Sequence, residues 1–156
     1  MTEETNASLE ESVNLAEKMM GAFSARILHL ENLMCNIMDQ HFRLDNAERA
    51  VIFLSAMTPD MSFRNKINIF INMIKIYYDE IYKTHDSDLR KLYEIDKYWN
   101  DLATLMIAQS GQASKNTQTI SLEATGKEHE SKVRLCIRIA AILNAIQREI
   151  LINKLS

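Results

Sequence analysis

Residues 62–81 decide the fold, and they read SFRNKINIFINMIKIYYDEI. Their apolar residues recur at steps of three and four, the period of an α-helix, and the helix is expected to start at Ser62. Apolar side chains cover more than one face, so we expect this helix at the centre of a bundle or between two subunits. One row consists of Phe63, Ile67, Phe70, Ile71, Ile74, Tyr77, Tyr78 and Ile81, and a second row of Ile69, Met73 and Ile76.

A long helix is predicted ahead of this segment. It should begin near Asn6 or Ser8, after a flexible N-terminus of residues 1–6, and end at about His41. Gly21 lies inside it and costs about 1 kcal/mol relative to alanine. Its apolar stripe, at helical spacing, consists of Leu9, Val13, Ala16, Met20, Phe23, Ile27, Leu30, Met34, Ile37 and Met38.

A second helix is predicted between these two. Asp45 precedes Glu48 by three residues, which is the spacing of a capping box at a helix start. Residues 58–60 read Thr-Pro-Asp and should end the helix, because proline does not continue a helix and restricts the residue before it.

Two further helices are predicted after residue 81. A break is expected at Thr84–Asp86, with Ser87 as the N-cap of a helix that ends near residue 110. Residues 111–127 are polar and irregular, and Thr119–Leu122 alternate as in a short extended piece. The last helix is expected over residues 128–154.

Length and composition agree with this pattern. The chain has 156 residues with 3 glycines and 1 proline, too few for the many turns of a sheet-rich fold. We therefore expect one all-α domain over residues 7–156, a bundle of about five helices with a long first helix and one longer loop before the last.

Charge and cysteine content restrict the class of protein. The net charge of -3 argues against a dedicated non-specific nucleic-acid binder, although it leaves room for a local basic patch. There is no long uncharged run for a membrane span and no apolar signal segment, so we expect a cytoplasmic protein with no membrane partner. Cys35 and Cys136 lie in apolar helical runs and are expected to be buried free thiols.

The sequence shows no motif of catalytic, metal or cofactor chemistry. CxxC, HExxH and Gly-rich phosphate loops are missing, and no histidine lies three or four residues from another. His41 is expected at a helix C-terminus, where its positive form suits the helix dipole, and His129 is expected to be solvated. We therefore predict no catalytic residue, no metal and no cofactor.

Basic and aromatic residues gather around the fourth predicted helix. Such a patch stacks bases and neutralises phosphates in single-stranded RNA binders. Against this, Tyr93 and Trp99 fall on the apolar stripe, and acidic residues alternate with the basic ones, which favours a packed helix with a solvated face. The basic residues are Lys83, Arg90, Lys91 and Lys97, and the aromatic ones are Tyr82, Tyr93, Tyr98 and Trp99.

Three stretches together resemble the HEPN superfamily of helical bundles. They are Leu30–Met34, then Met61–Ile69, which is similar to the family's Phe-x-x-Lys-Ile helix opening, and Lys91–Thr104, which is similar to its signature helix. The resemblance extends over most of the chain, from Phe23 to Ile150, and implies a helical bundle in which two signature helices usually meet across a dimer. In active members the signature is Arg-Asn-x-x-Ala-His, and its Arg and His act on the scissile phosphate of RNA.

The chain departs from that signature at its reactive positions. Trp99 stands where the Arg would be and Thr104 where the His would be, while Asn100 and Ala103 match. Trp offers no charged fork for a phosphate, and Thr does not shuttle a proton near neutral pH. The family signature has an Arg, then four to six residues, then a His, and no arginine of this chain precedes a histidine at that spacing. A ribonuclease site of the family type is therefore not predicted.

We expect a non-catalytic HEPN-like binding or scaffolding module that forms a homodimer. One alternative is an RNA-binding or ribonuclease-type HEPN protein, and another is a small helical partner-binding or immunity-type protein with a methionine-rich surface. RNA or another protein is therefore the expected partner. The candidate binding residues are Arg90, Lys91, Lys97, Trp99, Asn100 and Thr104.

Overall fold

The structure is a computed structural model, and it describes residues 3–45, 61–110 and 122–155 together with Glu48, Val51, Ile52 and Ser55. The helices with defined bounds in these residues are α1 (Glu3–Asp45), α3 (Phe63–Tyr77), α4 (Asp79–Leu89), α5 (Lys91–Ser110) and α6 (Leu122–Leu155). Single residues separate the middle helices: Tyr78 lies between α3 and α4, and Arg90 lies between α4 and α5. The predicted all-α bundle is confirmed for the described part of the chain.

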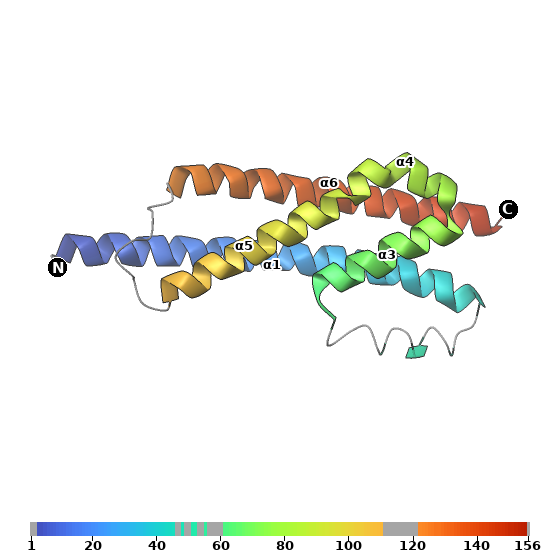
Figure 1. The fold of residues 1–156 in the computed structure, drawn as a ribbon, viewed down its shortest axis with the longest axis horizontal. Coiled ribbons are helices and arrows are strands. Elements are labelled where there is room, and N and C mark those ends of the chain that lie inside the picture. The colour runs from blue at the N-terminus through green and yellow to red at the C-terminus, as the bar shows by residue number, and fades with distance from the viewer. Residues whose placement is uncertain are drawn as a thin grey trace.

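The helices pack as two long rods crossed by the middle of the chain. Figure 1 shows α1 and α6 running side by side in the same direction, with α5 running back across them. α3 lies against α1, and α4 carries the chain from α3 into α5 while contacting α6. No described helix is long and apolar enough to cross a membrane.

One hydrophobic core joins these helices. Its largest fully buried side chains include Phe23 of α1, Phe70 of α3 and Leu92 of α5. Burying each such side chain stabilises the fold by about 1.5–3 kcal/mol. On α3 the predicted inner row is buried at Phe63, Ile67, Phe70, Ile71 and Ile74, and Met73 of the second row is buried as well. Ile76 and Tyr77, in contrast, are exposed by 71% and 59%.

The predicted start of α3 is confirmed. Ser62 has an extended backbone (φ -60°, ψ 153°), and its side-chain oxygen accepts a hydrogen bond from the Asn65 backbone N–H at 3.3 Å. This bond satisfies one of the N–H groups that a helix start leaves without an internal partner.

The predicted break at Thr84–Asp86 is wrong, because these residues and Ser87 lie inside α4. The break falls at Tyr78, whose backbone leaves the helical region (φ -140°, ψ 54°) while its N–H still bonds to the Ile74 carbonyl. The Tyr78 hydroxyl lies 2.8 Å from His41 Nδ1 on α1. A tertiary contact thus accompanies the break, and neither residue carries a turn signal in the sequence.

The ends of the other helices differ from the predictions by several residues. α1 begins at Glu3 and runs to Asp45, so His41 lies inside it and is buried, 4% exposed, instead of capping its end. α6 begins at Leu122, which contradicts the predicted irregular conformation for residues 122–127. Most of the predicted second helix, and residues 111–121, lie outside the described residues.

Candidate functional site

Trp99 stands where the resembled signature has its arginine, and it packs toward the core. Its ring is half-buried and stacks on Phe23 of α1, with centroids 6.2 Å apart and planes at 25°. Tyr98 meets the same Phe23 edge-on at 5.0 Å, and His129 of α6 lies 5.8 Å from it. Trp99 therefore belongs to an aromatic cluster that joins α1, α5 and α6.

Asn100 and Thr104 use their side chains on their own helix. Asn100 Nδ2 donates to the Asp96 carbonyl at 3.0 Å, and Thr104 Oγ1 donates to the Asn100 carbonyl at 2.8 Å. Bonds of this kind, back to the carbonyl four residues earlier, are common for Ser, Thr and Asn within helices. Neither hydrogen bond activates a group for catalysis.

Two of the three basic candidates, Arg90 and Lys91, are engaged in ion pairs. Arg90 forms an ion pair with Asp86 at 2.9 Å, and Lys91 pairs with Glu94 at 2.7 Å, both near the start of α5. Lys97 is exposed and has no ion pair within the described part of the chain. It lies on the same side of α5 as Asn100 and Thr104, whereas Trp99, two residues further on, points about 160° away from Lys97.

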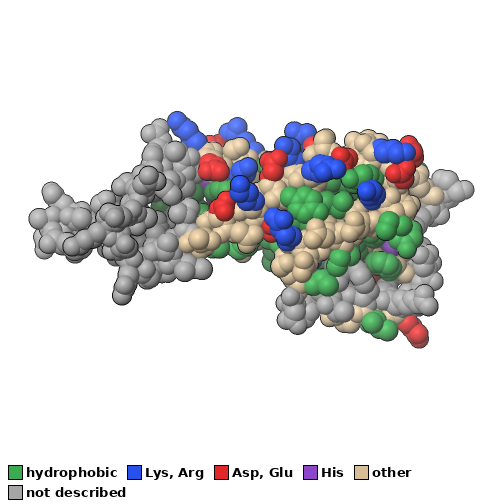
Figure 2. Space-filling model, viewed as in Figure 1, with side chains coloured by type: hydrophobic (Ala, Val, Ile, Leu, Met, Phe, Trp, Pro, Cys, Tyr) green, Lys and Arg blue, Asp and Glu red, His purple; other side chains and the backbone are tan. Residues whose placement is uncertain are grey.

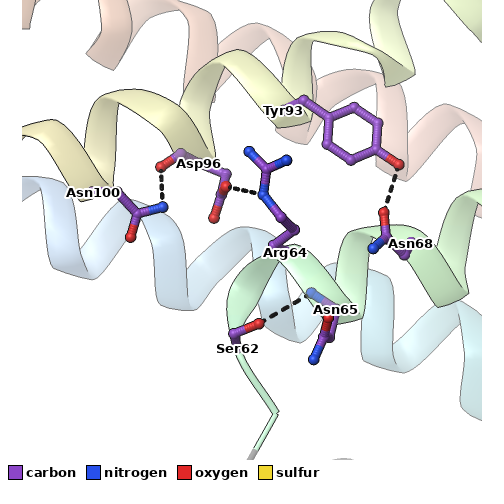
Figure 3. A network of polar contacts seen from close by, with 7 residues as sticks. All are labelled: Ser62, Arg64, Asn65, Asn68, Tyr93, Asp96 and Asn100. Carbon is purple, nitrogen blue, oxygen red and sulfur yellow. Dashed lines mark hydrogen bonds and ion pairs between the residues drawn. The ribbon is translucent and has the colours of Figure 1, made fainter.

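A polar network that the sequence analysis did not identify lies between α3 and α5 (Figure 3). Arg64 Nε donates to Asp96 Oδ2 at 2.8 Å, and the Asp96 side chain is only 3% exposed while that of Arg64 is 52% exposed. The Arg64 guanidinium also lies over the Tyr93 ring at 5.7 Å. Tyr93 in turn donates its hydroxyl hydrogen to Asn68 Oδ1 at 2.8 Å.

The sequence contained one signal for this network. Asp96 lies four residues after Leu92 and three before Trp99, so it falls on the apolar side of α5. A carboxylate in that position needs a cation, because burying an unpaired charge is costly. The sequence does not say which cation, since Arg64 lies 32 positions away.

A second ion pair joins the first turn of α3 to α1. Lys66 Nζ lies 3.1 Å from Glu31 Oε1 of α1, and the two side chains are 9% and 19% exposed. Arg64 and Lys66 therefore bind α3 to α5 and to α1, respectively. Lys66 occupies the lysine position of the Phe-x-x-Lys-Ile resemblance, and Phe63 and Ile67 of that motif are buried.

Burial favours the neutral forms of four titrating side chains, which are two cysteines, one tyrosine and one histidine. Burial raises the pKa of Cys136 to about 11 and also raises the pKa of Cys35, so both free thiols are protonated and weakly nucleophilic at neutral pH. Burial, with a smaller effect from Glu128, raises the pKa of Tyr98 to about 12. Burial lowers the pKa of His129, whose Nδ1 lies 3.0 Å from the Tyr98 hydroxyl. His129 is thus part of the packed interface and not the solvated residue predicted.

The surface around the network mixes charges with apolar side chains. Figure 2 shows Lys and Arg spread over the face that carries α3, α4 and α5, with Asp and Glu between them. No group of three His, Cys, Asp or Glu within the described residues is arranged to hold a metal ion. In comparisons with family models, curated proteins and solved structures, no match to this chain was found.

Proposed function

We propose that the chain is a non-catalytic HEPN-like binding or scaffolding module that works as a homodimer. The observation that supports this most directly is the use of three signature positions for structure. Trp99 packs on Phe23, while Asn100 and Thr104 hydrogen bond to carbonyls of their own helix. At Trp99 and Thr104, where active members of the resembled family hold Arg and His, this chain has a packed ring and a hydrogen bond within the helix.

RNA cleavage is the first property to test. We expect incubation with mixed RNA to give no cleavage and no salt-sensitive binding, because a site lacking both Arg and His has neither the phosphate fork nor the proton shuttle. The RNA-binding alternative rests on Lys97, which is exposed and has no ion pair in the described part of the chain. RNA cleavage that disappears in Lys97→Gln would favour that alternative. Lys127→Gln, which changes an exposed lysine on α6, is the control and should leave such cleavage unchanged.

Dimer formation is the second property. Light scattering during size exclusion should give twice the chain mass of 18.0 kDa. If the dimer uses the exposed side of α5, Asn100→Arg places two like charges opposite each other and should dissociate it. Asn32→Arg, on an exposed position of α1, is the matched control. A monomer at high micromolar concentration contradicts the dimer.

The partner-binding or immunity-type alternative loses one of its supports. It relied on a methionine-rich surface, which suits adaptable binding. Within the described side chains, however, Met34, Met38 and Met73 are buried, and the others are at least partly covered. If the chain binds a protein, the contact surface must be sought elsewhere.

A further inference from the structure

The solvent-facing side of α3 is rich in hydrogen-bond donors, and the helix itself supplies no carboxylate. The Asp86 carboxylate of α4 is held by Arg90, with a smaller effect of Lys75 in lowering its pKa. Helix α3 reads FRNKINIFINMIKIY and contains no acidic residue. Its exposed side carries Arg64, Asn68 and Lys75, which share one face because they are spaced by four and seven residues, with Asn72 beside them. Partner surfaces of opposite charge are favoured at such a face.

Arg64 is held in a defined orientation. Its Nε donates to the buried Asp96 carboxylate, and Figure 3 shows the two terminal nitrogens pointing away from α3 with no dashed contact. Within the described residues these nitrogens have no hydrogen-bond partner. A fixed guanidinium with a free edge matches the two oxygens of a carboxylate.

The amides of this face suit a peptide backbone. Asn68 Oδ1 accepts from Tyr93, so the Asn68 NH2 group remains available to donate to a carbonyl. Asn72 is exposed one turn further along the helix. Lys75 lies eleven positions after Arg64, or about 16 Å along a helix, and an extended peptide covers that distance with about five residues.

We propose that the exposed side of α3 from Arg64 to Lys75 binds an extended acidic peptide segment of a partner protein. Arg64 and Lys75 receive carboxylates about five residues apart, and Asn68 and Asn72 bond to the backbone between them. This rests on the proposed binding function and names the chemistry of its partner. A single-stranded nucleic acid fits less well, because Arg64 covers the Tyr93 ring and Trp99 stacks on Phe23, which leaves neither ring free for bases.

The test uses the full chain and a fluorescein-labelled ten-residue peptide with glutamates at its second and seventh positions. Fluorescence anisotropy at low salt should show saturable binding, and replacing both glutamates by glutamine should abolish it. Arg64→Gln should weaken binding about tenfold and Lys75→Gln about threefold, since a charge-assisted bond is worth more when its donor is fixed. Arg134→Gln, at an exposed position of α6, should leave the affinity unchanged.

Asp96→Asn separates positioning from simple charge. Removing a negative charge should strengthen anion binding if only net charge matters, whereas the proposal expects weaker binding because Arg64 loses its anchor. Far-UV circular dichroism identifies any variant that fails to fold, and Lys75→Gln, on an exposed side chain, then carries the test. Tighter binding by a folded Asp96→Asn, or equal binding of the glutamine peptide, overturns the proposal.

Oligouridine of twelve nucleotides serves as the competing ligand. Arg64-dependent binding of the oligonucleotide without peptide binding overturns the peptide assignment. Failure of peptide binding does not contradict the proposed function, because dimer formation and the absence of RNA cleavage are measured separately. RNA cleavage, conversely, overturns the non-catalytic proposal whatever the peptide does.

Discussion

On the side of α5 that faces α1 and α6, Tyr98 and Trp99 pack on Phe23, whereas on the side that faces α3, Asp96 pairs with Arg64. The aromatic side gains its stability from area removed from water, which depends little on direction. The polar side depends on one distance and one orientation, since a buried carboxylate is tolerated only with its partner in place. The same helix therefore carries a side that stabilises the bundle and a side that orients a charged group.

Phe23→Ala should give the largest effect on the aromatic side. Phe23 is fully buried, and truncating a buried Phe costs about 3–5 kcal/mol. Urea unfolding followed by circular dichroism measures the loss. Leu28→Ala on the same helix is the control, because Leu28 is 57% exposed and should change the free energy of unfolding by about 0.5 kcal/mol or less. A similar loss of unfolding free energy in both variants would show that Phe23 does not belong to the core.

Arg64→Ala tests the polar side and should cost about 2–3 kcal/mol, because it leaves the Asp96 carboxylate buried without a cation. Asp96→Asn should cost about 1 kcal/mol, since the half-exposed Arg64 reaches water when its partner is neutral. The double variant should be no less stable than Arg64→Ala alone. Equal losses of unfolding free energy in the two single variants would contradict the difference in burial between Arg64 and Asp96.

His129 adds a pH dependence to the aromatic side. Its pKa in the folded protein lies below the ordinary value because burial disfavours the charged ring. The unfolded chain therefore binds more protons, so stability is fully present above about pH 6.5 and is lost as the pH falls through the lower, folded pKa. Unfolding at pH 7.5 and 5.5 measures this loss, which should shrink in His129→Gln. An unchanged pH difference would show that other groups cause it.

The apolar spacing predicted the helices better than it predicted their ends. Periodicity located α3 and the buried row of α1, because burial of one face requires that spacing. It misplaced the break between α3 and α4, since Tyr78 leaves the helix where its hydroxyl meets His41, a contact between residues 37 positions apart. Local turn residues such as Thr84 and Ser87 were overruled by that packing.

The candidate site was predictable only in part. The resemblance aligns Trp99 and Thr104 with the reactive positions of its signature, which no comparison tests, whereas Trp99 was correctly assigned to the apolar stripe. The sequence grouped Lys91 and Lys97 by nearness along the chain, although Lys91 pairs with Glu94 and Lys97 lies on another side of α5. The link from Arg64 to Asp96 depends on how α3 packs on α5, which no local pattern contains.

Gly21→Ala should give the smallest change and should stabilise the protein. Gly21 lies inside α1 two residues before Phe23, and a Cβ atom built there meets nothing within 4 Å. Alanine therefore adds helix propensity without a clash, worth up to about 1 kcal/mol in urea unfolding. Ala22→Gly, at the neighbouring exposed position, should lower stability by a similar amount. If Gly21→Ala were destabilising instead, another surface must approach α1 closely at that position, and the outer side of the aromatic region would then be an interface.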